Sequence, residues 1–147
     1  MTPVFQTIID KGRGNCMSAA VASILDLPLE EVPNWVTRAF DEGQPHRHYV
    51  YMREWLESKG LHLVRVNYKH FGDWRSLVGA YAIASVPSQR FEHTTHAVIV
   101  TWTKLESGAH QISIVHDPNP SNAPYDLDKV EPVDIYFVVP KHPRVCK

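Results

Sequence analysis

The spacing of the apolar residues changes at Gly60, and this change constrains the fold more than any other feature of the sequence. Before Gly60, apolar residues recur every three or four positions, as in amphipathic helices. After it, short apolar runs rich in β-branched residues are separated by turn-forming residues, as in strands. Helices are predicted at residues 17–25, 35–40 and 49–59, and strands at 61–66, 80–86, 95–103, 111–116 and 133–139. This order predicts an α+β domain whose helices pack on one side of a mostly antiparallel β-sheet.

Residues typical of helix ends mark the borders of these elements. Gly60 suits the left-handed position that follows a helix. Asn15 is expected to cap the first helix, and Asp73 a short turn or helix over residues 73–77. Residues 117–125 contain three prolines and predict an ordered or semi-ordered loop.

The length and composition are those of one globular domain. The chain has 147 residues, 44% hydrophobic and 21% charged, and we expect a single domain over residues 1–147. No apolar run approaches the ~20 residues that cross a bilayer. A formal net charge of -1 gives no global field that would attract nucleic acid. Neither a membrane nor a nucleic acid is therefore expected as a partner.

The two cysteines, Cys16 and Cys146, lie at opposite ends of the chain, and its start lacks the basic and apolar regions of a secretory signal. Reduced thiols in the cytoplasm are therefore expected, rather than a disulfide framework. Two cysteines are too few for the usual structural zinc site. The histidines of His46-Arg47-His48 could bind a metal or phosphate, but the proline-flanked loop favours a solvated role. No metal or organic cofactor is expected.

Three residues suggest nucleophilic chemistry. Cys16 begins the first predicted helix, where the helix dipole and free backbone N–H groups favour a thiolate. His96 opens the strand 95–103, and Asp117 directly follows the strand 111–116. An imidazole beside a thiol can take its proton and later protonate a leaving group. A carboxylate beyond the imidazole would orient it.

The hairpin between the last two strands decides what lies opposite His96. If Lys104 and Ala109 close a four-residue loop, His96 faces Asp117. If Ser107-Gly108 is a tight two-residue turn, His96 faces Asn119 instead. Directly opposed side chains are about 5 Å apart at Cβ, so either residue could orient the imidazole.

Three blocks of the sequence resemble those of papain-like cysteine peptidases, most of all the compact bacterial peptidases of the C39-like group. They are Gly14-Asn15-Cys16-Met17-Ser18-Ala19-Ala20, His96-Ala97-Val98-Ile99-Val100 and His116-Asp117-Pro118. The resemblance implies a papain-like fold with an N-terminal nucleophile helix. It further implies Cys16 as nucleophile, His96 as general base and acid, and Asp117 as the residue that orients His96.

The family also places a glutamine shortly before the nucleophile, where its amide helps to bind the oxyanion of the tetrahedral intermediate. Gln6 is the only glutamine upstream of Cys16, and the ten-residue separation is longer than the usual pattern. Asp10 lies nearer the usual place, but an ionised carboxylate would repel an oxyanion. The backbone N–H of Cys16 is the second expected donor.

The expected function is therefore that of a cytoplasmic thiol hydrolase cleaving a peptide, isopeptide or related amide bond in a peptide or protein substrate. Three alternatives stay open. The same triad could transfer the acyl group to an amine. The domain could be catalytically silent and bind a peptide or protein partner, or Cys16 and Cys146 could form a redox sensor. The sequence leaves the oligomeric state open.

Five aromatic residues lie between the first predicted helix and the sheet: Trp35, Phe40, Tyr49, Tyr51 and Trp55. They could line a substrate groove. Their helical spacing favours positions that face the hydrophobic core.

Overall fold

The computed structural model describes residues 1–70 and 75–141. Within these residues the chain forms three α-helices and one five-stranded antiparallel sheet, which confirms the α+β class. The helices are α1 (Cys16–Leu25), α2 (Trp35–Asp41) and α3 (His48–Ser58). The strands are β1 (Leu61–Asn67), β2 (Tyr81–Pro87), β3 (Thr95–Lys104), β4 (His110–His116) and β5 (Asp134–Pro140). Both Asp73, the predicted cap, and Cys146 lie outside the described residues.

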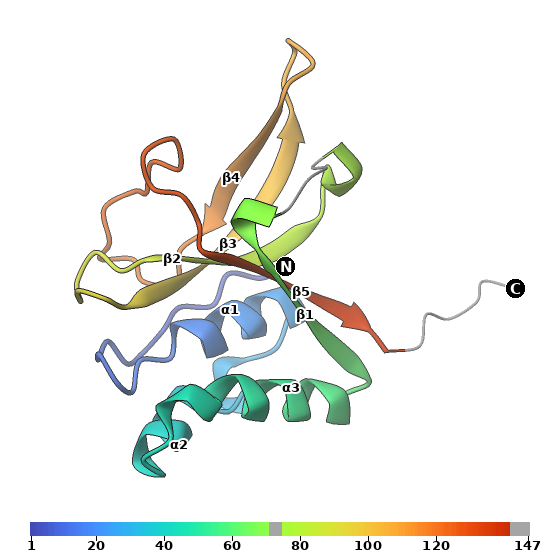
Figure 1. Ribbon diagram of the computed structural model, residues 1–147. Coiled ribbons are helices and arrows are strands. Elements are labelled where there is room, and N and C mark those ends of the chain that lie inside the picture. Colours follow the sequence, from blue (N-terminus) through green and yellow to red (C-terminus); the bar gives the residue numbers. More distant parts are fainter. Residues whose placement is uncertain (71–74, 142–147) are drawn as a thin grey trace, which may run out of the picture.

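The strands are ordered β1-β5-β2-β3-β4, so the C-terminal strand lies inside the sheet, between β1 and β2. All three helices lie on one side of this sheet (Figure 1). The other side is covered by short segments and loops that contribute Tyr68, Leu77 and Leu127. No helix of the described chain is long and apolar enough to span a bilayer.

The alternation of side chains in the strands divides the core between the two faces of the sheet. Ile83 and Ile99 pack on the helical face with Val21 and Met52, and all four are fully buried. Their strand neighbours, such as Val98, pack on the opposite face. The sheet is therefore apolar on both faces, which explains why β2 and β3 each contain five consecutive buried residues.

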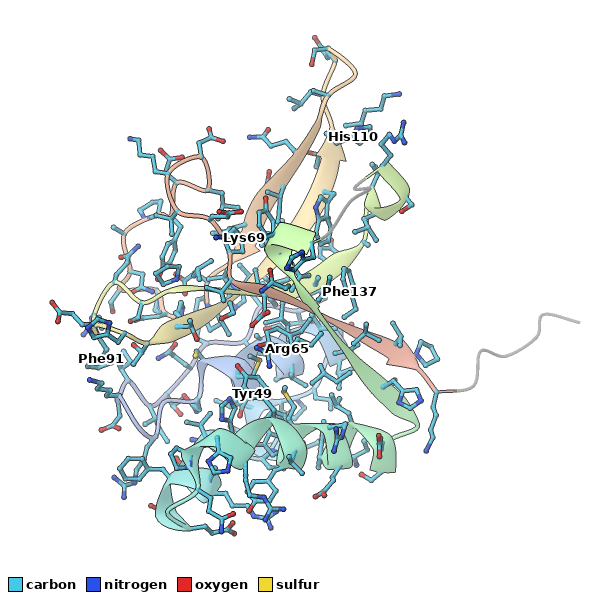
Figure 2. All side chains as sticks on the ribbon, viewed as in Figure 1. Tyr49, Arg65, Lys69, Phe91, His110 and Phe137 are labelled. Atoms are coloured by element: carbon cyan, nitrogen blue, oxygen red, sulfur yellow. The ribbon has the colours of Figure 1, made fainter. Side chains whose placement is uncertain are left out.

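The region between α3 and β1 combines aromatic and charged groups. The Arg65 guanidinium lies 5.2 Å from the centre of the Tyr49 ring and donates to Asp134 at 2.8 Å (Figure 2). Tyr136 donates a hydrogen bond of 2.9 Å to the Tyr49 hydroxyl. These contacts attach α3 to the β1–β5 pair at a place where polar side chains enter the core.

Both loops predicted for the β3–β4 hairpin are wrong, although the pairing of Ile99 with His116 has the offset predicted from the two-residue turn. Lys104 pairs with His110, and Leu105 donates its N–H to the Ala109 carbonyl, so the loop contains three residues. Its last residue, Gly108, has a φ of 84°, the left-handed position of a turn followed by a bulge. A second irregularity between Ile99 and Val100 shifts the pairing again, so that Ile99 lies opposite His116.

We expect Leu56→Ala to lower the free energy of unfolding by about 2–5 kcal/mol, because the Leu56 side chain is fully buried in the core and its truncation leaves a cavity. Arg53→Ala, in the same helix but on its exposed face, should change it by less than about 0.5 kcal/mol. Urea denaturation followed by circular dichroism measures both. Equal losses for the two variants would contradict the assignment of Leu56 to the core.

Candidate active site

The fold brings Cys16, His96 and Asp117 together from three elements. Cys16 is the first residue of α1, His96 the second residue of β3, and Asp117 the residue that follows β4. Cys16 and His96 line one cleft, together with Gln6, Asn119 and Asn122. The three residues are 101 positions apart in sequence from first to last, and only the tertiary structure makes them neighbours.

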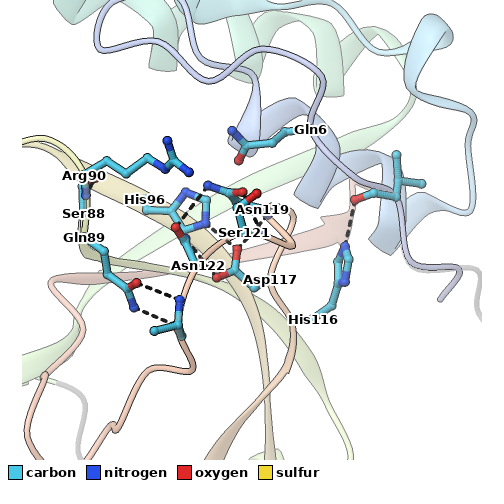
Figure 3. Close-up of polar contacts among 12 residues, drawn as sticks. Gln6, Ser88, Gln89, Arg90, His96, His116, Asp117, Asn119, Ser121 and Asn122 are labelled. Atoms are coloured by element: carbon cyan, nitrogen blue, oxygen red, sulfur yellow. Dashed lines mark hydrogen bonds and ion pairs between the residues drawn. The ribbon is translucent and has the colours of Figure 1, made fainter.

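The imidazole of His96 lies between the other two groups. Its Nε2 is 2.6 Å from Oδ1 of Asp117 (Figure 3), which leaves Nδ1 as the ring nitrogen for the hydrogen bond with Cys16. The His96 side chain is buried, whereas Cys16 is half-buried and is a free thiol. The imidazole thus lies between the Cys16 thiol, which interacts with it, and the Asp117 carboxylate, to which it is hydrogen-bonded.

The charge state of His96 follows from these contacts. Burial lowers the pKa of His96, but the hydrogen bonds with Asp117 and Cys16 and the negative charges of both raise it, to about 9 overall. The ring is therefore an imidazolium at neutral pH. A cation in this position can stabilise a neighbouring thiolate and can donate a proton to a leaving group.

Asp117 is held by donors on both of its carboxylate oxygens. Oδ1 accepts from His96 and, at 2.8 Å, from the backbone N–H of Asn119, while Oδ2 accepts from the Asn122 side chain at 3.1 Å. Burial raises the pKa of Asp117, but the hydrogen bonds from His96, Asn119 and Asn122 outweigh burial and lower the pKa. The carboxylate thus stays ionised opposite the imidazolium.

Asn119 lies next to Asp117 and does not form the hydrogen bond to the imidazole. Its side-chain Nδ2 donates to Oδ1 of Asn122 at 3.1 Å, and its Oδ1 accepts from the N–H of Ser121 at 3.0 Å (Figure 3). The Asn119 backbone N–H and the Asn122 side chain thus both hold the Asp117 carboxylate in place. Asn122 was not among the predicted site residues. The pattern of Asx-type turn residues in the segment Asp117-Pro118-Asn119-Pro120-Ser121-Asn122 is the signal that could have indicated it.

Asn15 is the N-cap residue of α1, as predicted, but its side chain does not cap the helix. Its Oδ1 accepts from the N–H groups of Thr7 and Ile8 at 3.0 and 2.9 Å, and its Nδ2 donates to the Thr7 hydroxyl. The Asn15 side chain makes no capping hydrogen bond to the helix. It organises the preceding loop instead, and leaves the N–H groups of the first turn of α1 uncapped at the position of Cys16.

The same loop explains the long separation between Gln6 and Cys16. Gly14 donates its N–H to the Asp10 carbonyl at 3.1 Å, so the chain folds back on itself before α1 begins. The Asp10 carboxylate accepts from the N–H groups of Gly12 and Arg13 at 2.8 and 2.9 Å. Asp10 is therefore used to shape the loop, while Gln6 reaches the cleft.

Gln6 is placed to contribute a donor. Its backbone N–H is bonded to the Pro118 carbonyl at 2.9 Å, and its Nε2 donates to the Ile8 carbonyl at 3.1 Å. An amide nitrogen carries two hydrogens, so a second donor remains beyond the bond to Ile8. The Oε1 atom is buried and accepts no hydrogen bond.

The loop between β2 and β3 supplies further residues of the cleft, and none of them was predicted from the sequence. Ser88, Arg90, Phe91 and Thr94 all line it with His96. Ser88 accepts hydrogen bonds of 3.2 Å from the N–H groups of Arg90 and Phe91, which define the course of the loop. No motif marks these residues, because their position depends on how the loop folds over α1.

The remaining candidates lie elsewhere. Trp35 and Tyr51 are buried in the core, whereas Phe40 is 42% exposed and packs under the Arg13 guanidinium. His46 is exposed, and Nδ1 of His48 lies 2.6 Å from the Pro45 carbonyl. Within residues 1–70 and 75–141, no group of three or more potential ligands is arranged to hold a metal ion.

The arrangement of thiol, imidazolium and ionised carboxylate beside an uncapped helix N-terminus is suited to nucleophilic attack on a carbonyl carbon. No protein-family model, curated protein or solved structure matches this chain. The chemistry of the site is set by the contacts described above.

Asp117→Asn should lower the pKa of His96 from about 9 toward its ordinary value near 6.5, because a neutral amide removes the negative charge opposite the ring. A pH titration of the imidazole nitrogens by NMR measures this. Asp128→Asn, which removes an exposed carboxylate from the same loop, is the matched control and should leave the titration unchanged. A wild-type His96 that already titrates near 6.5 would contradict the description of the ion pair.

The same ion pair should make stability depend on pH. Folding raises the pKa of His96 from 6.5 to about 9, so its contribution is complete below pH 6.5 and disappears as the pH rises through 9. The difference in free energy of unfolding between wild type and His96→Gln should therefore shrink by at least about 1 kcal/mol between pH 6 and pH 10. Urea denaturation at several pH values measures it, and a constant difference would refute the prediction.

Proposed function

We propose that this protein is a papain-like thiol hydrolase that cleaves a peptide, isopeptide or related amide bond through an acyl-enzyme on Cys16. The observation that carries the proposal is the hydrogen-bonded pair of His96 and Asp117 in the same cleft as the Cys16 thiol, which begins a helix. The order of the elements also supports it: the nucleophile begins a helix that packs against the sheet, and the base and the orienter lie at adjacent strand ends.

In the first half of the reaction, the Cys16 thiolate attacks the carbonyl carbon of the amide, and a carbon–sulfur bond forms. The oxyanion that develops is stabilised by the Cys16 N–H at the start of α1 and by the second amide hydrogen of Gln6. The tetrahedral intermediate collapses as the carbon–nitrogen bond breaks. His96 gives its proton to the departing amine, and becomes neutral.

In the second half, water attacks the thioester. Neutral His96 takes a proton from the water, the carbon–sulfur bond breaks, and the thiolate and imidazolium are restored. Asp117 stays ionised throughout and keeps Nδ1 directed at the sulfur by holding Nε2. The reaction requires a reduced thiol, which fits a cytoplasmic enzyme acting on a peptide or protein.

The rate of alkylation of Cys16 by iodoacetamide between pH 4 and pH 9, followed by peptide mass mapping, tests the proposal without a known substrate. We expect fast reaction at pH 6, where an ordinary thiol with a pKa near 8.5 is almost wholly protonated. His96→Ala should remove this advantage, because the imidazolium that stabilises the thiolate is lost. Cys16→Ala should abolish the modification and retain the fold.

His93→Asn is the matched control for the histidine change. His93 lies in the β2–β3 loop, just before the strand that contains His96; it is exposed and has a φ of 58°, a conformation that asparagine tolerates well. It should leave the alkylation profile of Cys16 unchanged. Cys146 serves as the internal reference thiol, and a Cys16 that reacts more slowly than Cys146 at every pH would overturn the proposal in favour of a domain that only binds its partner.

A further inference from the structure

The cleft around Cys16 has side walls from two separate segments, and each carries one cation and one apolar side chain. The segment before α1 contributes Lys11 and Ile9, and the β2–β3 loop contributes Arg90 and Phe91. Ile9 is 42% exposed. The Arg90 side chain extends from its loop toward the space between His96 and Gln6 (Figure 3).

Neither of these two cations is paired with an acidic side chain of the described residues, so neither charge is neutralised. Arg13, Arg38 and Arg65 each form an ion pair of 3.0 Å or less with a carboxylate. Among residues 1–70 and 75–141, no acidic side chain lies within ion-pair distance of either Lys11 or Arg90. Both therefore retain their full capacity to bind an anion.

The acidic groups near the cleft do not cancel this charge. Asp117 is occupied by His96, Asn119 and Asn122. Asp10 lines the cleft, but its Oδ1 accepts two backbone hydrogen bonds from its own loop. Outside the Cys16–His96 pair, the lining thus contains two cations against one carboxylate that is already hydrogen-bonded.

We propose that the substrate carries a carboxylate close to the scissile amide bond, and that Arg90 and Lys11 bind it. This inference rests on the proposed function and names the substrate class of the same site. A guanidinium binds a carboxylate through two parallel N–H donors, and the lysine ammonium adds a point charge. The carboxylate can belong to an aspartate or glutamate side chain or to the end of a peptide, since both present the same group. Ile9 and Phe91 would contact apolar atoms beside it.

Two alkylating reagents of nearly equal size test this directly. Iodoacetate and iodoacetamide both form a bond from a CH2 carbon to the Cys16 sulfur and release iodide. Iodoacetate transfers a carboxymethyl group and iodoacetamide a carbamoylmethyl group, so only iodoacetate carries a carboxylate. The ratio of their rates at Cys16, divided by the same ratio for N-acetylcysteine, reports recognition of the anion. His96 also attracts an anion, so the comparison between variants, rather than the wild-type ratio alone, is decisive.

Arg90→Gln and Lys11→Gln should each lower this ratio about two- to fivefold, and the double variant should lower it further. Arg53→Gln removes one exposed positive charge from α3, outside the cleft, and should leave the ratio unchanged. Raising the salt concentration to about 1 M should reduce the wild-type ratio toward that of the double variant, because it shortens the range of charge interactions to about 3 Å.

Matched peptidyl reagents distinguish the two sources of the carboxylate. Faster reaction of N-iodoacetyl-glutamic acid α-amide than of N-iodoacetyl-glutamine amide indicates an acidic side chain. Faster reaction of N-iodoacetyl-glycine than of its amide indicates a chain terminus. Either preference, lost in Arg90→Gln, supports the inference.

Two failures are distinguishable. If Cys16 reacts rapidly with iodoacetamide in a manner that depends on His96, but neither Arg90→Gln nor Lys11→Gln changes the ratio, the inference is wrong and the proposed function stands. If Cys16 is unreactive toward all of the reagents, both are wrong.

Discussion

The hydrogen bond between His96 and Asp117 joins two strand ends that the sheet itself does not join. Pairing between β3 and β4 ends where Ile99 lies opposite His116, whereas β3 remains paired with β2 as far as Thr95. The two strands therefore separate just where His96 and Asp117 occur, and the 2.6 Å contact between their side chains continues the connection. The bulge between Ile99 and Val100 makes this possible, because it shifts β4 by one residue before the strands part.

The segment before α1 depends on the same strand end. His116 binds the Val4 carbonyl through Nε2 at 2.8 Å, and Gln6 donates its N–H to Pro118 on the other side of Asp117. Val4 in turn donates its N–H to Ser23 in α1 at 2.9 Å. Thus the residues that flank Asp117 also hold Gln6 and, through α1, the helix that presents Cys16. The positions of Cys16, Gln6 and Asp117 are therefore linked through these hydrogen bonds.

The elements could be predicted from the sequence because their signals are local. Apolar spacing identified three helices and five strands, and Gly60, with a φ of 75°, ends α3 as expected. The register along the whole β3–β4 hairpin could not be predicted, because it depends on the left-handed Gly108 and on a bulge at Ile99. No residue type in the sequence indicates that bulge. The N-cap position of Asn15 could be predicted, but the partners of its side chain could not: the side chain can bind several N–H groups, and only the path of residues 7–14 decides which. The cations Lys11 and Arg90 became visible as neighbours only once both loops were placed around Cys16.

The contacts of His96 also suit the two opposite tasks that the proposed reaction gives it. Burial lowers its pKa, and the hydrogen bonds and charges of Asp117 and Cys16 raise it. Formation of an acyl-enzyme removes the negative charge and the hydrogen bond of Cys16, since the sulfur becomes part of a neutral thioester, while burial and Asp117 remain. The pKa of His96 therefore falls in the intermediate, relative to the free enzyme. In the free enzyme the pKa of the ring is high enough to keep it protonated beside the thiolate. In the acyl-enzyme the lower pKa favours the neutral ring, which can act as a base toward water. Asp117 alone could not produce this change, because its charge is constant; the change comes from the nucleophile, which alters its own charge as the reaction proceeds.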